Sequence, residues 1–149
     1  MKSSKGFTLI EVMITVIIVA VLASIAVPSY NRQVTKTRRT DCQGVLINFS
    51  LNMERFFAAN NTYIGAADGG ATGAPLATVF PSECPLDAGT KYYDLTITAA
   101  TASNYTLTAT PKGIQVDDGF LQLSSAGVKS WDQDNSGGID AGENSWDAH

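Results

Sequence analysis

The sequence predicts an α+β protein in which one long N-terminal helix, half of it able to span a membrane, packs on a three- or four-stranded antiparallel sheet. Three observations predict this fold class: an apolar run over residues 7–27, a helical stripe of large apolar side chains after it, and alternating strand patterns in the second half of the chain. The chain is 44% hydrophobic with a net charge of −4. These values are typical of a folded domain and argue against a surface built mainly to bind nucleic acid.

The apolar run is long enough to cross a membrane. Residues 7–27 contain three hydroxyl side chains and one carboxylate, Glu11. At about 1.5 Å per residue, roughly 20 helical residues span a hydrocarbon core of about 30 Å. A secretory signal peptide is the alternative, but its apolar region has about 7–15 residues and precedes its cleavage site. Here the run is longer, and the Gly6-Phe7 junction stands before it.

The stretch from Lys5 to Tyr30, KGFTLIEVMITVIIVAVLASIAVPSY, resembles the N-terminus of type IV pilins and of the pseudopilins of type II secretion. The resemblance implies cleavage between Gly6 and Phe7 by a prepilin peptidase, which also methylates the new N-terminus. It implies a leader over residues 1–6, a transmembrane and assembly helix over 7–29, and a head over 30–149. It also implies the type IV pilin fold.

Glu11 and Pro28 take defined roles in this resemblance. An unpaired carboxylate at mid-membrane costs about 2.5–3.5 kcal/mol, less near an interface. Cleavage would create a partner, since the family is thought to pair this acid with the N-terminal amine of a neighbouring subunit; the alternative is that Glu11 reaches the lipid headgroups. Pro28 removes a backbone donor, so we expect a bend or local melting of the helix there.

The helix is expected to continue to about Asn60, where the pair Asn60-Asn61 is a plausible end. An apolar stripe predicts that this part packs on the sheet; its members are Val45, Phe49, Met53, Phe56 and Phe57. A basic collar just after the apolar run is expected to be a solvated face, a headgroup contact or a subunit–subunit ion pair; it comprises Arg32, Lys36, Arg38 and Arg39.

Strand patterns follow a Gly/Ala-rich loop at residues 65–75. Apolar and polar residues alternate over 93–98 and over 105–110, and a turn at 102–104 joins them as a hairpin. A third strand is expected over 120–123, and a turn at 124–127 then leads towards Val128 and Trp131.

Cys42 and Cys84 are the two cysteines of the chain. An exported protein meets an oxidising environment, which favours a bridge between them, although two buried free thiols remain the alternative. The bridge would close about 40 residues and stabilise the fold by about 3–4 kcal/mol. Many pilins place their disulfide around the C-terminal loop, so this pair departs from the family pattern.

The stretch DQDNSGGIDAGE at residues 132–143 fits an EF-hand-like calcium loop. Gly137 is the turn glycine, and Ile139 takes the apolar position that pins the loop to its support. The predicted ligands are Asp132, Asp134, Ser136, the Gly138 carbonyl, Asp140 and Glu143. The flanks predict strand and turn rather than helices. The sequence thus predicts a lone structural calcium site, with an acidic solvated tail loop as the alternative.

No catalytic constellation is recognisable in the sequence, and the single histidine, His149, is expected to be a frayed end. We therefore expect a non-enzyme, itself a substrate of the prepilin peptidase/N-methyltransferase. Its expected partners are other pilin subunits and the inner-membrane assembly machinery, with the membrane before assembly and no direct nucleic acid.

The expected function is a structural subunit of a type IV pilus, with a minor pilin favoured over a major one, supporting assembly, twitching motility or adhesion. The alternatives are a type II secretion pseudopilin, a filament-exposed adhesin or DNA-uptake subunit, and a plain single-span protein. Positive charge after the apolar run would place the head in the cytoplasm by the positive-inside rule. The resemblance instead implies an inner-membrane precursor with a periplasmic head, and later a cell-surface pilus.

Overall fold

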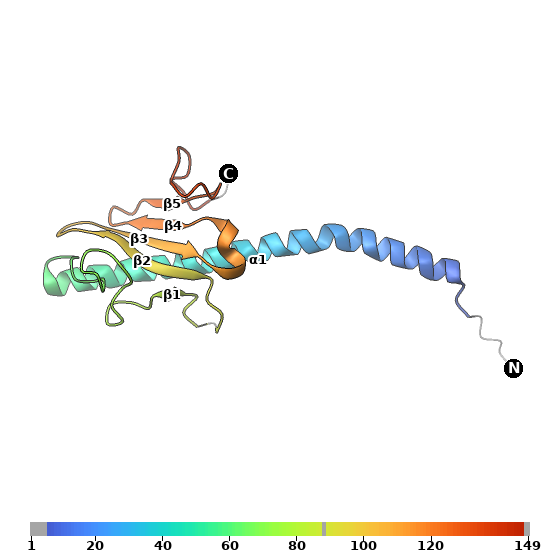
Figure 1. Ribbon diagram of the computed structural model, residues 1–149, viewed down its shortest axis with the longest axis horizontal. Helices are drawn as coiled ribbons and strands as arrows, with labels where there is room; N and C mark the ends of the chain where they lie inside the picture. The colour runs from blue at the N-terminus through green and yellow to red at the C-terminus, as the bar shows by residue number, and fades with distance from the viewer. Residues whose placement is uncertain (1–5, 88, 148–149) are drawn as a thin grey trace. The chain divides into compact units, whose positions relative to one another are not determined.

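The computed structural model describes residues 6–87 and 89–147, so most of the expected leader and His149 lie outside the described residues. The chain forms two compact units, one up to Lys36 and one from Thr37 onward. Helix α1, Leu9–Asn60, contributes to both (Figure 1). Each unit is described by itself below.

The first unit is the apolar part of α1, and its start is fixed by a reciprocal pair of hydrogen bonds. The Glu11 amide donates to Thr8 Oγ1 over 3.3 Å, and the Thr8 amide donates to Glu11 Oε2 over 2.9 Å. This is a capping box, which satisfies two of the backbone donors that a helix start leaves open. Pro28 lies inside the helix, and the local melting expected there does not occur.

The apolar part of α1 is long and apolar enough to cross a membrane, with a mean hydropathy of 2.8 over its most apolar window. None of the residues in this most apolar stretch of the helix is buried. All residues from Phe7 to Val27 are exposed, whereas an apolar core helix of a soluble domain would be covered.

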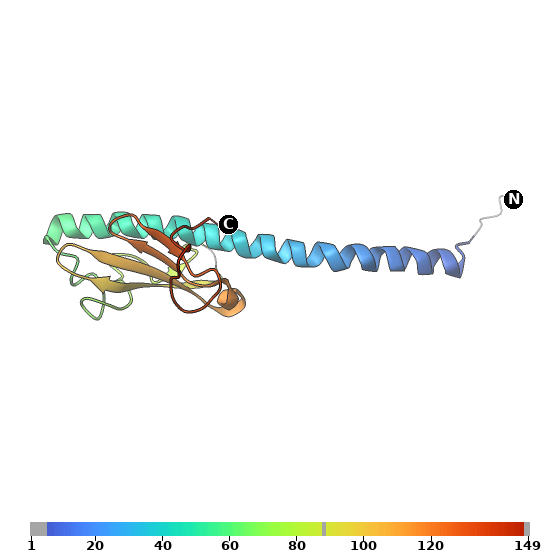
Figure 2. The ribbon, with the colours of Figure 1, turned by 90° about the horizontal axis from the view of Figure 1, so that it is seen from above.

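The second unit is a head in which the remainder of α1 packs on one face of a twisted antiparallel sheet (Figure 2). The sheet has five strands in sequence order, rather than the three or four expected. They are β1 (Glu83–Cys84), β2 (Tyr93–Ala100), β3 (Tyr105–Pro111), β4 (Leu121–Ser124) and β5 (Lys129–Trp131). The short β1 and β5 lie at opposite edges (Figure 1), and β1 is too short to show a sequence period.

The core of the head lies between α1 and the sheet. Val45, Phe49 and Met53 of the predicted stripe are buried, and Phe56 and Phe57 pack against them half-buried. The sheet contributes alternate residues in register, because successive side chains of a strand point to opposite faces. These include the paired sets Leu95↔Ala109, Ile97↔Leu107, Leu107↔Leu123 and Leu121↔Trp131.

The segments between the main elements mostly follow the sequence predictions. Helix α1 ends at Asn60, and Asn61 has a φ of 54°, a conformation that asparagine tolerates at helix ends. Residues 65–75 form a loop without a named strand, though Gly73 bridges to Ile97. A 3₁₀ helix, η1 (Gly113–Asp118), was not expected and connects β3 to β4.

Candidate functional site

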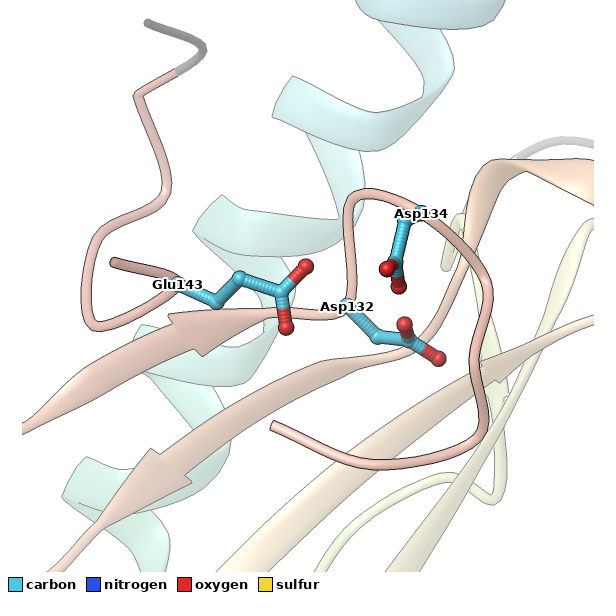
Figure 3. A group of neighbouring side chains, drawn as sticks. All are labelled: Asp132, Asp134 and Glu143. Atoms are coloured by element: carbon cyan, nitrogen blue, oxygen red, sulfur yellow. The ribbon is translucent and has the colours of Figure 1, made fainter. Parts of the chain in front are cut away.

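The acidic loop after β5 gathers three carboxylates. One oxygen from each of Asp132, Asp134 and Glu143 lies within 4.8 Å of the others, a group that could hold a metal ion. Figure 3 shows these carboxylates together beside the end of β5. They come from the first, third and twelfth positions of the predicted loop, so the structure brings the two ends of the motif together.

Backbone turns place these carboxylates. Asp132 accepts hydrogen bonds from the Ser136 amide at 2.9 Å and the Gly137 amide at 3.0 Å. Gly137 has a φ of 87°, a conformation that costs little only for glycine. Glu143 accepts from the amides of Gln133 and Asp140 at 2.6 and 2.9 Å, so it reaches back to both arms of the loop.

Two of the remaining predicted ligands lie near this group. The Ser136 hydroxyl is 3.5 Å from Asp132 Oδ1 and 3.4 Å from Asp140 Oδ2. Gly138 is exposed, and a Cβ at its position would meet nothing within 4 Å.

The loop concentrates negative charge in a partly buried place. Asp132 is completely buried and Glu143 is nearly so, while Asp134 is exposed. Within residues 6–87 and 89–147, neither buried carboxylate forms an ion pair with a cationic side chain. Burying an ionised carboxylate is unfavourable unless a counter-charge or a metal compensates it. The donor set is all oxygen, as hard cations such as Ca²⁺ prefer.

The last segment fastens the loop to the sheet and to α1. The Trp131 amide donates to the Glu143 carbonyl at 3.0 Å and closes the loop. The Trp146 indole donates to the carbonyls of Gln122 and Ser130 at 3.2 and 3.1 Å. Gln43 of α1 donates to the Trp146 carbonyl at 3.3 Å. Both tryptophans therefore pack beside the loop.

A second polar cluster, buried between α1 and η1, changes the interpretation of the basic collar. Arg39 is buried, pairs with Asp118 at 2.7 Å and lies 3.5 Å from the Trp131 ring centroid. Tyr93 and Gln115 also donate to Asp118. Burial raises the pKa of the Asp118 carboxyl, while its hydrogen bonds and the Arg39 charge oppose that shift. The expectation that Arg39 is solvated or contacts lipid headgroups is therefore wrong, because its side chain is buried in an ion pair within the head.

Cys42 of α1 and Cys84 of β1 form a disulfide, as the sequence favoured. Both cysteines are fully buried in the core. Because β1 has only two residues, this bond is a main attachment of the preceding and following loops to α1. No free cysteine is present.

Thr8 is a residue that sequence reasoning missed. Its hydroxyl donates to Glu11 Oε2 at 2.7 Å, in addition to the capping-box contacts. The signal was available, because Thr8 and Glu11 have the spacing of a capping box just before an apolar run. Gly6 and Phe7, which precede this cap, are exposed.

Comparison with family models agrees with this architecture. A model described as "Prokaryotic N-terminal methylation motif" matches residues 1–27. A second model, described as "Type IV minor pilin ComP, DNA uptake sequence receptor", matches residues 28–120.

Curated proteins with similar sequences point the same way. The chain is 32% identical to "Prepilin peptidase-dependent protein D" of Escherichia coli (strain K12) over 78 residues, 52% of this chain and 53% of the relative. It is 46% identical to "Type IV major alpha-pilin" of Moraxella bovis over 46 residues, 31% of this chain and 29% of the relative. It is 30% identical to "Fimbrial protein EcpC" of Eikenella corrodens over 115 residues, 77% of this chain and 67% of the relative.

The match spans about half the length of the first relative and less than a third of the second. No solved structure matches the chain.

An exposed apolar N-terminal helix, which lies within a methylation motif and continues into a helix-on-sheet head, defines a type IV pilin-like protein. The chain belongs to the type IV minor pilin family, since the model of that family covers more than half of it. This membership points to a structural rather than a catalytic protein.

Proposed function

We propose that this protein is a structural subunit, a minor pilin, that polymerises into a type IV pilus through its N-terminal helix. One observation carries the proposal: all residues of the apolar run from Phe7 to Val27 are exposed. Such a surface needs lipid before assembly and helices of other subunits afterwards. The filament would support twitching motility or adhesion.

Processing would precede assembly. Cleavage between Gly6 and Phe7 leaves a cationic amine at Phe7, and methylation keeps that charge. The Thr8–Glu11 capping box supports a precursor in which the Glu11 carboxylate is hydrogen-bonded while it lies in the membrane, which lowers the cost of placing it there. In the filament, Glu11 would pair with the Phe7 amine of a neighbouring subunit, and Pro28 would mark where the helix leaves the bilayer.

The corresponding location is the inner membrane with the head in the periplasm, followed by the cell-surface pilus. The partners would be the prepilin peptidase/N-methyltransferase, the inner-membrane assembly machinery and other pilins. A pseudopilin of type II secretion would use the same steps but a different machine. Recovery of the chain from secretion assemblies rather than from sheared pili would favour that alternative.

Mass spectrometry of sheared surface filaments tests the proposal. The expected mature chain begins at a methylated Phe7. A Gly6→Ala variant should stay uncleaved and be missing from the filaments. Gly89→Ala is a matched control, because Gly89 is exposed and has open space around its Cβ position. A mature chain that starts at Met1, or filaments that contain the uncleaved variant at normal amounts, would refute the proposal.

DNA uptake is a second candidate function, favoured by the description of the matching family model. The charge of the head weighs against it, since residues after Lys36 include thirteen Asp and Glu but six Lys and Arg. Several of these cations are engaged within the head. Lys112 pairs with Glu83 and Asp94, and Lys91 donates to two backbone carbonyls. DNA affinity rests largely on cations that neutralise phosphates.

A DNA-binding measurement separates these functions. The full chain in detergent would be titrated with duplex DNA at two salt concentrations. We expect no saturable binding at physiological salt. Affinity in the micromolar range or tighter that falls steeply with salt would instead support DNA uptake.

The acidic loop is proposed to bind calcium as a structural ion. The support is the all-oxygen donor set, the convergence of three carboxylates and the buried Asp132 without a cationic partner among the described residues. The ligands would be Asp132, Asp134, Ser136, the Gly138 carbonyl, Asp140 and Glu143. Bound calcium would neutralise the loop and hold the Trp131 and Trp146 segments to the sheet.

A further inference from the structure

The head has a groove to which the proposed function assigns no role. It lies between one side of α1 and the chain just after β1, and its volume is about 700 Å³. Asp41, Gly44 and Val45 line it from α1, and Leu86 and Asp87 line it from the other wall. The Cys42–Cys84 bond joins the two walls, so the groove has a defined width.

The lining suits a long cationic side chain. Asp41 and Asp87 are exposed carboxylates that belong to opposite walls, and no ion pair involves either of them in the described part of the chain. Gly44 leaves open space on the helix side, because a Cβ there would meet nothing within 4 Å. The apolar lining residues Val45, Pro85 and Leu86 can accept the aliphatic stem of Arg or Lys, and the carboxylates can accept hydrogen bonds from its charged end.

The chain itself carries the complementary segment. Arg32 and Lys36 stand four residues apart on α1, a spacing that places two side chains on one helix face. Both are exposed. Of the other collar residues, Arg38 lies 4.2 Å from the Tyr92 ring centroid and Arg39 is buried.

We propose that this groove receives the basic segment of a second copy of the chain, with Arg32 and Lys36 of that copy reaching Asp41 and Asp87. The inference rests on the proposed polymerisation and names one contact within it. Parallel neighbours shifted along the filament axis would repeat the contact from subunit to subunit. Such a repeated, non-closing contact between different surfaces builds a filament rather than a dimer.

Filling the groove tests the contact. Gly44→Leu adds a side chain to open space and replaces a poor helix former, so the head should melt at the same temperature or higher. Its amount in sheared filaments should fall about two- to tenfold, as for the loss of one or two partly exposed ion pairs. Ala58→Leu is the matched control on an exposed position of the same helix and should assemble normally. Normal assembly of Gly44→Leu would overturn the proposal.

A cross-linking experiment identifies the occupant. Cells would produce two full-length variants together, Lys36→Gln, which keeps the groove acids, and the double variant Asp41→Asn/Asp87→Asn, which keeps Lys36. A zero-length carbodiimide applied to their filaments can then join Lys36 to Asp41 or Asp87 only between two chains. We expect that amide-linked peptide by mass spectrometry.

The outcomes are distinguishable from failure of the proposed function. Filaments that contain both variants but lack the peptide overturn the proposed contact and leave the pilin function intact. Links from the groove acids to a chain of different sequence overturn the second copy as the occupant. Absence of both variants and of the parent chain from filaments would instead refute the proposed function.

Discussion

Calcium should raise the melting temperature of the head, and the structure allows the size of the effect to be worked out. Without an ion, two charges 4.8 Å apart repel by about 3 kcal/mol at an effective dielectric constant of about 20. The repulsion that involves Asp134 is smaller because that side chain is exposed. Calcium removes this repulsion and adds ligand bonds to the buried Asp132 and Glu143.

The expected shift follows from mass action. An extracellular loop of this kind has a Kd on the order of 10⁻⁴–10⁻³ M, so ~10 mM calcium stabilises the folded chain by about 1.4–2.7 kcal/mol. For a head of roughly 110 residues, with about 4 °C per kcal/mol, the melting temperature rises by about 5–11 °C.

The assay is a thermal melt of the full chain in detergent, followed by near-ultraviolet circular dichroism, with either excess chelator or calcium. Trp131 and Trp146 flank the loop and report its order. Glu143→Gln should abolish the calcium-dependent shift, whereas Asp147→Asn, an exposed acid outside the loop, should retain it. Equal melting temperatures of the parent chain with and without calcium would refute the reasoning.

Three further predictions concern the head. Arg39→Met should lower the free energy of unfolding by about 3–5 kcal/mol, since it leaves the Asp118 carboxylate buried without its cation. In urea titrations, the double variant Arg39→Met/Asp118→Asn should recover part of that loss. Cys42→Ser should lower the free energy of unfolding by about 4 kcal/mol relative to the parent chain under oxidising conditions, because it removes the bridge to Cys84. It should also raise the rate of proteolysis around residues 81–92. Equal stability of the two chains would contradict a bridge in the mature protein. Burial and the Asp118 charge raise the pKa of Tyr93, so above pH 10 only the unfolded chain loses this proton and stability falls by about 1.4 kcal/mol per pH unit. Tyr93→Phe should show a flatter decline of stability with pH, and an unchanged slope would contradict this assignment.

The sequence was informative where a pattern is local. The apolar run of α1, the stripe from Val45 to Phe57 and the hairpin of β2 and β3 follow from period and composition, because each pattern repeats over several residues. The twelve-residue acidic motif likewise predicted that Asp132, Asp134 and Glu143 come together, since turns within one short segment bring its ends close.

Sequence patterns did not predict the strand β1, the helix η1 or the burial of Arg39. Two residues cannot show alternation, and η1 has exposed apolar residues that carry no stripe. Arg39 belongs to a run of basic residues that all look solvated in sequence. Its partner Asp118 is 79 positions away, so the ion pair exists only because β3 and η1 return to α1.

By itself, the sequence determined that this chain has a long apolar helix with one acid near its start and a small α+β head, because hydrophobic periodicity and short motifs depend on neighbours along the chain. Tertiary structure alone decided which cation is buried, that the disulfide joins α1 to β1 beside a groove, and which acids that groove presents. Those features join residues far apart in sequence, and only packing brings them together.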